Sequence, residues 1–443
     1  MTEVSLSEIL DAREMRAKLQ KKLSEKYHST LISFTMNIAG PVKNSPLITR
    51  AFSIGVSELE AYLPEDKILY SQIESENPTG PFAIYAVNED AYRVKKICVG
   101  IEEKTALGRL FDIDVIDKNL KKLNRDSERG CIVCNASGRA CAAGRLHPVS
   151  EIQGVMRRIM TDGVFRRDAE RIASLAVQAL IKEVKTTPKP GLVDLRNNGS
   201  HPDMSVEIFE KSAVSLEGYF LESIETGRKY ADETYDKLFS ELRRAGILAE
   251  KNMYDVTGGV NTHKGAIFSF GILCGGIGRL WTPECPVADS CKIFDTAAKI
   301  ARIALESDLA SPVGTTAGER MFIKHGVAGI RGEAASGFPS VSKLALPIYQ
   351  SLLGCGLSDN HSGVITLLNL IASIDDTTLY KRGGMAGLSF AKEYAGRLIK
   401  ENPQPEINQV EDMDDEFIKR NLSAGGAADL LAVTYFIDSL YEE

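Results

Sequence analysis

The chain contains 443 residues with a mass of 48.4 kDa, and at roughly 150 residues per domain this length predicts two or three domains. Hydrophobic residues make up 44% and charged residues 26% of the sequence, a globular composition that excludes disordered and fibrous classes. The net charge is −7, so the chain as a whole lacks the basic surface that nucleic-acid binding requires. We expect no nucleic-acid partner, although a local basic patch could bind phosphates.

The N-terminal segment is charged throughout and has no apolar centre of the kind found in secretory signals. The uncharged stretch Gly265–Gly278 is well short of the ~20 apolar residues that a membrane span needs. Eight cysteines are too few in a chain of this length for a disulfide scaffold. These features predict a cytoplasmic protein with reduced thiols and no membrane partner.

Residues 1–165 combine helix and strand patterns. After a charged helical start, strands are predicted at Leu31–Ile38, Phe82–Val87, Val94–Val99 and Leu110–Ile116, the last with apolar and acidic residues in alternation. The predicted fold class of this first domain is α+β.

From about Arg166, apolar residues recur at helical spacing, as in Ile172, Leu175, Ala179 and Leu180. Similar segments continue to the C-terminus and are separated by Gly-rich and Pro-rich connections. Residues 166–443 are therefore predicted to form a second, mainly α-helical domain.

The first domain contains two carboxylates two residues apart in the string GRLFDIDVID. In a strand, Asp112 and Asp114 project from one face, an arrangement that suits Mg²⁺ bridging to substrate phosphates. Arg109 just before the pair could bind the same phosphates. The alternative is that the two acids form the solvent-exposed face of an edge strand.

Cys131, Cys134, Cys141 and His147 form a second cluster with ligand types that suit Zn²⁺. Only six residues separate Cys134 from Cys141, which is shorter than in common zinc modules. The alternative is a set of ordinary reduced thiols.

Charged residues gather in the connections of the second domain. His263 and Lys264 follow two glycines and precede an apolar run, so backbone amides at a helix start and Lys264 could bind an anion. Carboxylates for a metal ion and basic groups for phosphates also occur beside glycines. They comprise Lys189, Glu319, Arg320, Arg331, Glu333, Asp375, Asp376 and Arg382. Each is ordinary alone, since acids at helix ends are often merely solvated.

Several long motifs occur in one order and resemble two known enzyme families. NIAGPVKNSPL, GRLFDIDVID and the cysteine cluster resemble the apo-citrate lyase phosphoribosyl-dephospho-CoA transferases. KPGLVDLRNNGSHPDM, GGVNTHKGAIFSFG, TAGER, GIRGEAASGFPSV, RGGMAGL and NLSAGGAADLLAVTYF are similar to the triphosphoribosyl-dephospho-CoA synthases. The resemblance spans nearly the whole chain and implies a natural fusion of the two enzymes.

The resemblance implies two consecutive reactions. In residues 166–443, dephospho-CoA attacks the ribose of ATP, adenine leaves, and the triphosphate is retained. In residues 1–165, a serine of the acyl carrier (gamma) subunit of citrate lyase attacks that product and diphosphate leaves. ATP, dephospho-CoA and the carrier are the expected partners.

Residue type and motif position, taken with these two reactions, suggest roles for the charged residues. Mg²⁺ is expected on Asp112 and Asp114, one of which could also deprotonate the serine, and on Glu319, Asp375 and Asp376 in the second domain. Glu333 is expected to stabilise charge and His263 to protonate adenine. Expected phosphate ligands are Lys189, Lys264, Arg320, Arg331 and Arg382.

Three alternatives remain at this point. The first domain could only dock the carrier while the synthase alone is active. The carrier could belong to a malonate decarboxylase, or the chain could be a nucleotide-sensing chaperone that modifies nothing. Adenine release together with a mass gain on the carrier would exclude the docking and chaperone alternatives. The choice between a citrate lyase and a malonate decarboxylase carrier needs a comparison of the two carriers.

Overall fold

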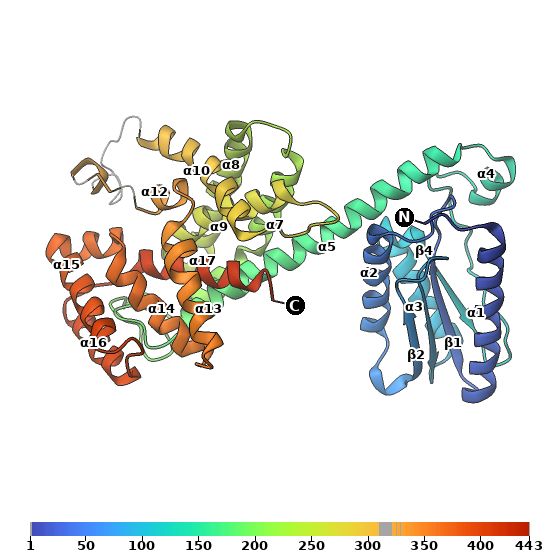
Figure 1. Ribbon diagram of the computed structural model, residues 1–443, viewed down its shortest axis with the longest axis horizontal. Helices are drawn as coiled ribbons and strands as arrows, with labels where there is room; N and C mark the ends of the chain where they lie inside the picture. Colours follow the sequence, from blue (N-terminus) through green and yellow to red (C-terminus); the bar gives the residue numbers. More distant parts are fainter. Residues whose placement is uncertain (1, 310–320, 325, 328, 443) are drawn as a thin grey trace. The chain divides into compact units, whose positions relative to one another are not determined.

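The computed structural model describes residues 2–309, 321–324, 326–327 and 329–442 (Figure 1). The chain divides into two compact units: Met1–Asp168 with Thr282–Pro286, and Ala169–Trp281 with Val287–Glu443. Helix α5, Val149–Lys185, begins in the first unit and continues into the second.

The first unit contains a four-stranded antiparallel sheet with the strand order β2-β3-β1-β4. The strands are β1 (Thr30–Met36), β2 (Ile68–Glu74), β3 (Phe82–Val87) and β4 (Phe111–Ile116). The helices are α1 (Leu6–Tyr27), α2 (Pro46–Tyr62), α3 (Ala91–Lys104) and α4 (Gly138–Gly144), with short 3₁₀ turns η1 (Glu65–Lys67) and η2 (Leu107–Leu110). The predicted α+β class is confirmed.

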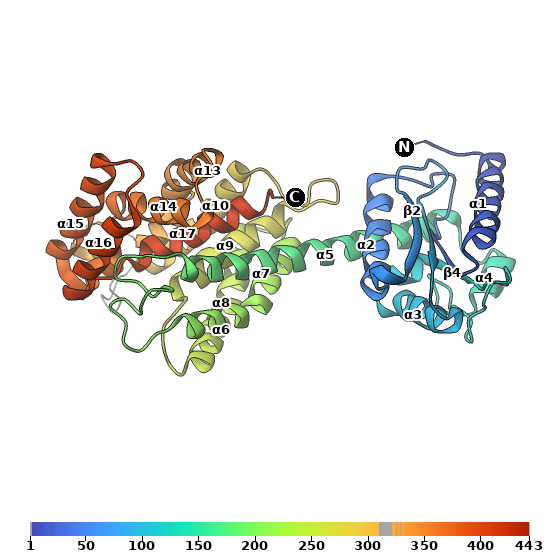
Figure 2. The same cartoon turned by 90° about the horizontal axis from the view of Figure 1, so that it is seen from below.

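The alternation of the strands assigns the two faces of this sheet to different helices. Phe34 and Phe111 lie on one face, where Phe34 stacks on Phe52 of α2 with ring centroids 4.8 Å apart. Leu31 and Ile84 lie on the other face and pack with Leu23 of α1. Figure 2 shows α1 and α2 on opposite sides of the strands. Side chains alternate between the two faces along a strand, so Asp112 and Asp114 lie on the face opposite Phe111, which is the side covered by α1.

One predicted strand is wrong. Val94–Val99 lies within α3, which begins after Asp90, whose side chain accepts a hydrogen bond from the Arg93 amide. Val94, Cys98 and Ile101 are all buried at helical spacing, so the apolar residues cover one face of a helix. Strand β2 was missed because it lies at the sheet edge and its residues are mostly exposed.

The second unit is nearly all helical, as predicted, and its described residues contain no strand. After α5 come α6 (Val206–Ser215), α7 (Glu217–Lys229), α8 (Tyr235–Thr257), α9 (Lys264–Leu280), α10 (Ser290–Leu309) and α12 (Gly329–Ala335). A π-helical turn η3 (Val341–Ala345) leads to α13 (Leu346–Gly354), α14 (Asp359–Ser373), α15 (Thr377–Glu401), α16 (Ile407–Lys419) and α17 (Gly425–Ser439).

Helix α9 contains the uncharged Gly-rich run and is the central helix of this unit, in contact with α7, α8, α10 and α17. A Cβ atom at Gly278 would lie 2.0 Å from the Ile224 carbonyl oxygen of α7, so glycine is needed for the close approach of the two helices. Phe270 stacks on Phe436 of α17 with centroids 5.2 Å apart. These contacts place the first turn of α9 beside α17, where the cavity described below opens.

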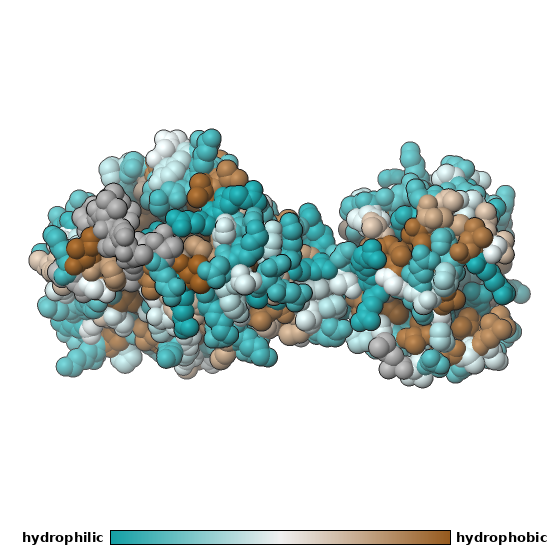
Figure 3. Space-filling model, turned by 90° about the horizontal axis from the view of Figure 1, so that it is seen from above, coloured by the Kyte–Doolittle hydropathy of each residue, from teal (hydrophilic) through white to brown (hydrophobic). Residues whose placement is uncertain are grey.

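Among the residues that the structure describes, no helix combines the length and the apolar character needed to cross a membrane. The face shown in Figure 3 has hydrophilic and apolar residues interspersed on each unit.

Candidate active sites

The second unit contains a cavity of about 1070 Å³ at the first turns of α9 and α15. The segment after α5, helix α12 and the start of α17 complete its walls. It brings together every described residue of this unit that the sequence proposed: Lys189, His263, Lys264, Arg331, Glu333, Asp375, Asp376 and Arg382. Glu319 and Arg320 lie outside the described residues.

Lys189 is buried in an internal ion pair. Its ammonium group donates hydrogen bonds to the Glu183 carboxylate and, over 2.8 Å, to the Glu183 carbonyl oxygen. Burial raises the pKa of Glu183, while the charge of Lys189 opposes that rise. The pair holds the segment after α5 against that helix. The Lys189 ammonium group therefore stabilises the wall of the cavity.

The Asp376 side chain accepts hydrogen bonds from the first turns of two helices. One carboxylate oxygen accepts hydrogen bonds from the amides of Thr378 (2.7 Å) and Leu379 (3.1 Å) in α15, and the other accepts from Ala427 (2.9 Å) in α17. Burial raises the pKa of this carboxyl, and the amide bonds counteract the rise. Since both oxygens are engaged, the position of Asp376 suits helix capping better than metal binding.

Arg382 fastens the polar segment after α5 to α15. Its guanidinium donates to the Ser200 carbonyl (2.9 Å) and the Asn421 side chain (2.6 Å), and lies 3.0 Å from Nδ1 of His201. Burial and the charge of Arg382 lower the pKa of His201 to about 4. His201 is therefore neutral near pH 7. The hydrogen bonds of Arg382 to Ser200 and Asn421 engage its guanidinium within the protein, although it was expected to bind phosphate.

His263 is almost completely buried immediately before α9. Its Nδ1 lies 2.7 Å from the Ser212 hydroxyl, and Nε2 has no hydrogen-bond partner among the described residues. Burial, together with the charge of Lys189, lowers the pKa of His263 to about 3. The imidazole is thus neutral near pH 7, which weakens the case for an acid that protonates adenine.

The remaining predicted residues also line the cavity. Lys264 pairs with Glu250, and Asp375 lies 2.7 Å from the Lys392 ammonium. Glu333 accepts a 2.7 Å hydrogen bond from the Ser340 amide, and burial raises its pKa. Arg331 lies on the same helix as Glu333, α12.

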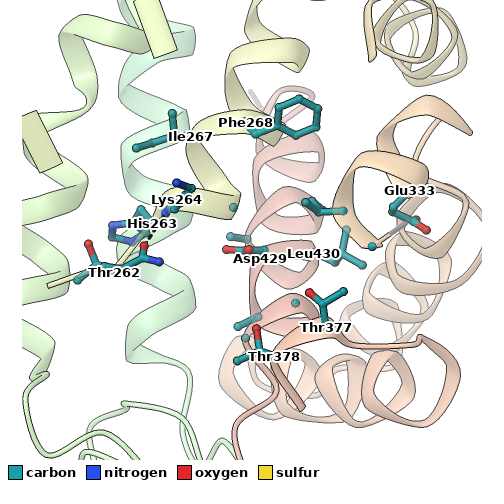
Figure 4. A pocket seen from close by; sticks show the side chains of 18 of the residues that line it. Thr262, His263, Lys264, Ile267, Phe268, Glu333, Thr377, Thr378, Asp429 and Leu430 are labelled. Carbon is teal, nitrogen blue, oxygen red and sulfur yellow. Dashed lines mark hydrogen bonds between the residues drawn. The ribbon is translucent and has the colours of Figure 1, made fainter. Parts of the chain in front are cut away.

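Sequence reasoning missed Asp429, which projects from α17 toward the first turn of α9 (Figure 4). Among the described residues, none donates a hydrogen bond to its carboxylate. Burial, followed by the charges of Glu183 and Asp376, raises its pKa well above the usual value. The available signal was a single acid inside the apolar string GGAADLLAVTYF, because an acid is rare in a buried helix unless it is paired.

In the first unit, Asp112 and Asp114 share one face of the edge strand β4, opposite Thr35 and Ser33 of β1. Asp114 pairs with Lys122 at 2.6 Å. Desolvation and the charge of Asp114 raise the pKa of Asp112 although its side chain remains reachable from solvent. The two carboxylates are therefore reachable from solvent but partly desolvated, unlike acids on a fully exposed face of an edge strand.

Arg16, a cation that the sequence did not indicate, lies on the same side of the sheet, near β3. Phe82, Thr35 and Asp112 are neighbours across β3, β1 and β4, which separates the outer two by about 10 Å. The guanidinium of Arg16 in α1 lies over the Phe82 ring at 5.9 Å. Arg109, in contrast, donates hydrogen bonds to the carbonyls of Gly130 (3.2 Å) and Cys131 (3.0 Å).

The structure brings Cys131, Cys134, Cys141 and His147 together, with one ligand atom from each within 4.8 Å of all the others. The Sγ atoms of Cys134 and Cys141 are 3.5 Å apart, and Nε2 of His147 lies 3.3 Å from Cys134. Hydrogen bonds from the Ala136 amide and from His147 lower the pKa of Cys134 to about 6. This cluster could hold a metal ion.

Two family matches account for the two units. Residues 4–163 match CitX, apo-citrate lyase phosphoribosyl-dephospho-CoA transferase. Residues 169–443 match CitG, ATP:dephospho-CoA triphosphoribosyl transferase. The chain belongs to both families and is a fusion of these two transferases, as the sequence motifs indicated.

Curated relatives show the same fusion. A protein of Haemophilus influenzae named Protein CitXG is 37% identical over 98% of this chain and 96% of its own length. One of the same name from Leuconostoc mesenteroides subsp. cremoris is 34% identical over 99% and 97%. A 2-(5''-triphosphoribosyl)-3'-dephosphocoenzyme-A synthase of Pectobacterium atrosepticum is 40% identical over 64% of this chain and 95% of its own.

Proposed function

We propose that residues 166–443 make 2'-(5''-triphosphoribosyl)-3'-dephospho-CoA from ATP and dephospho-CoA. The 2'-oxygen of dephospho-CoA forms a bond to the anomeric carbon of the ATP ribose, and the bond from that carbon to adenine breaks. The hydroxyl proton goes to a base, adenine takes up a proton, and the triphosphate stays on the product. The cavity beside α9 carries this assignment, because it collects the predicted charged residues.

The size and polarity of the cavity support two nucleotide substrates. Its volume of about 1070 Å³ lies at the upper end of the range for small-molecule sites. The N-terminus of α9 lines it and has no side-chain cap, and amides at a helix start together with the helix dipole favour anions there. We assign the triphosphate to this helix start, with Lys264 and Arg331 as its cationic ligands.

Asp429 is the group that we assign as general base for the 2'-hydroxyl. A carboxylate is most useful as a base at neutral pH when its pKa is raised toward neutrality, and burial beside Glu183 and Asp376 raises that of Asp429. His263 remains neutral and serves as a hydrogen-bonding group at the cavity wall. Lys189, Asp376 and Arg382 hold the wall in place.

The remaining carboxylates fit a requirement for Mg²⁺, since oxygen ligands suit this ion. Asp375 and Glu333 both line the cavity and would hold it, and Glu319 is a further proposed ligand on sequence grounds. When bound, Mg²⁺ neutralises charge on the triphosphate.

Asp429→Asn tests the synthase assignment. We expect this change to lower adenine release from ATP and dephospho-CoA about 100-fold or more, because Asn cannot accept the proton. Asp412→Asn, at an exposed position on α16, is the matched control and should leave the rate unchanged. Adenine release at the wild-type rate by Asp429→Asn would exclude Asp429 as the base.

For residues 1–165 we propose transfer of the phosphoribosyl-dephospho-CoA group to a serine of the citrate lyase acyl carrier subunit. The serine oxygen forms a bond to the innermost phosphorus of the triphosphate, the hydroxyl proton goes to a base, and the bond from that phosphorus to diphosphate breaks. Asp112 and Asp114 would hold the Mg²⁺ that neutralises the leaving diphosphate. Arg16, whose guanidinium lies over the Phe82 ring on the same side of the sheet, would bind another part of the substrate.

Intact-mass analysis of the apo-carrier tests this second assignment. Incubation with the chain, ATP, Mg²⁺ and dephospho-CoA should add the mass of phosphoribosyl-dephospho-CoA to the carrier. Asp112→Asn should abolish this gain and leave adenine release intact, whereas the exposed Asp66→Asn in η1 should change neither. A full mass gain with Asp112→Asn would overturn the role of this strand.

For the Cys131, Cys134, Cys141 and His147 cluster we propose Zn²⁺. Three sulfur donors and one nitrogen donor favour Zn²⁺ over Mg²⁺, which prefers oxygen.

A further inference from the structure

The segment that carries the three cysteines has almost no hydrophobic core of its own. Between Asn124 and Ser150, a range that the structure describes completely, the only buried residues are Cys131 and Cys141. Its regular structure there consists of the short helix α4 and the beginning of α5. A segment without an apolar core needs a metal ion, a disulfide or outside contacts to keep one conformation.

The four side chains are arranged as ligands of one tetrahedral ion. Zn²⁺ at about 2.3 Å from sulfur and 2.0–2.1 Å from nitrogen separates its ligand atoms by roughly 3.5–3.8 Å. The 3.3 Å and 3.5 Å contacts of Cys134 with His147 and Cys141 are close to those values. All eight cysteines are free in the structure.

The outer contacts of the cluster also match a metal site. Nδ1 of His147 lies 3.3 Å from a carboxylate oxygen of Glu151, which leaves Nε2 directed at the cysteines. A carboxylate on the other ring nitrogen is the usual support of a metal-bound histidine. The Val133 amide donates to Sγ of Cys131 over 3.4 Å, as an amide does when it stabilises a thiolate.

The same segment supports the strand that carries the transferase carboxylates. The carbonyls of Gly130 and Cys131 accept hydrogen bonds from Arg109, which immediately precedes Leu110 and β4. Arg129 donates to the Phe111 carbonyl over 2.7 Å and pairs with Glu102. Glu102 in turn accepts a 2.9 Å hydrogen bond from the Ile113 amide. Contacts from the cysteine segment therefore reach the backbone on both sides of Asp112.

We propose that Cys131, Cys134, Cys141 and His147 bind one structural Zn²⁺, and that this ion holds residues 129–147 against β4 so that Asp112 and Asp114 keep their positions. Metal loading then controls the transfer step and leaves the synthase step unaffected. The second statement rests on the proposed transferase function, whereas zinc binding does not.

Metal analysis of the full-length chain, purified under reducing conditions, tests the site directly. We expect about one Zn²⁺ per chain, lost in Cys134→Ser and retained in Cys355→Ser, which alters an exposed cysteine of the second unit. Glu151→Gln, a milder change, should weaken zinc affinity about 10-fold or more. Replacement by Co²⁺ should give the ligand-field and thiolate bands of a tetrahedral site. A chain without zinc, or a Cys134–Cys141 disulfide detected by mass, would overturn the site.

Hydrogen exchange and activity together test the role of the ion. Removing Zn²⁺ should increase amide exchange in Phe111–Ile116 and lower carrier modification at least 10-fold, with adenine release unchanged. Unchanged exchange and unchanged carrier modification in the zinc-free chain would refute the support role. If the zinc-loaded wild type modifies no carrier, the transferase proposal fails, and the exchange data still decide whether zinc holds β4.

Discussion

At the scale of single residues, the second unit places several acids close together in a poorly solvated region. Glu183, Asp376 and Asp429 all have raised pKa values, because burial disfavours their charged forms. The amide hydrogen bonds to Asp376 and the ion pair of Glu183 offset this cost in part. Asp429 has neither compensation, which agrees with the base role proposed for it.

This difference predicts how Asp429→Asn changes stability with pH. The folded-state pKa of Asp429 is raised above its unfolded value, so the folded chain holds the proton more tightly. Stability from this group is then lost as the pH rises from about 4 toward the folded-state pKa. Thermal unfolding without Mg²⁺ or nucleotide should show Asp429→Asn increasingly more stable than wild type from pH 4 to 8. A stability difference that shrinks with rising pH would contradict the raised pKa.

Asp376 should behave in the opposite way when it is changed. Asp376→Asn keeps one acceptor oxygen and replaces the other by an NH₂ group, so either the Ala427 amide or the Thr378 and Leu379 amides lose their acceptor. We expect the free energy of unfolding of the second unit to fall by about 2 kcal/mol, measured by urea denaturation. Asp236→Asn, an exposed first-turn acid of α8, should cost about 0.5 kcal/mol or less. Equal effects of the two changes would show that Asp376 has no special capping role.

At the scale of elements, the approach of α9 to α17 sets the position of Asp429. A Cβ atom at Gly265 would lie 1.9 Å from Oδ2 of Asp429, so Gly265→Ala must displace the carboxylate. We expect adenine release to fall about 100-fold with carrier modification from supplied intermediate unchanged. Gly396→Ala in α15, where a Cβ atom meets nothing within 4 Å, is the control. A synthase rate unaffected by Gly265→Ala would argue against this carboxylate position.

Elements were predictable where local pattern and tertiary environment agree. The buried strand β3 was predicted with its observed bounds, since all six of its residues are apolar and buried. The segment of α3 was misread because Val94, Cys98 and Val99 suit strand and helix alike, and the cap at Asp90 was not used. The mostly exposed β2 gave no apolar pattern to detect.

At the scale of the whole molecule, residue type identified the charged side chains around the cavity but not their partners. Lys189 and Arg382 were expected to bind phosphates, yet their strongest contacts are with Glu183, Ser200 and Asn421. Such pairings join segments far apart in the sequence, and no local spacing reveals them. Asp429 was missed for the same reason, because its value as a base depends on the acids packed around it.

Because each unit has its own core, the two activities should be separable between different chains. A mixture of Asp112→Asn, with an intact synthase, and Asp429→Asn, with an intact transferase, should modify the carrier through diffusion of the intermediate. Its rate should rise steeply with chain concentration, whereas the wild type should depend less on it, since tethering raises the local concentration of the intermediate. Intact-mass time courses over a dilution series measure both. If each variant keeps its remaining activity but the mixture leaves the carrier unmodified, the intermediate does not pass through solution, and the fusion serves direct transfer.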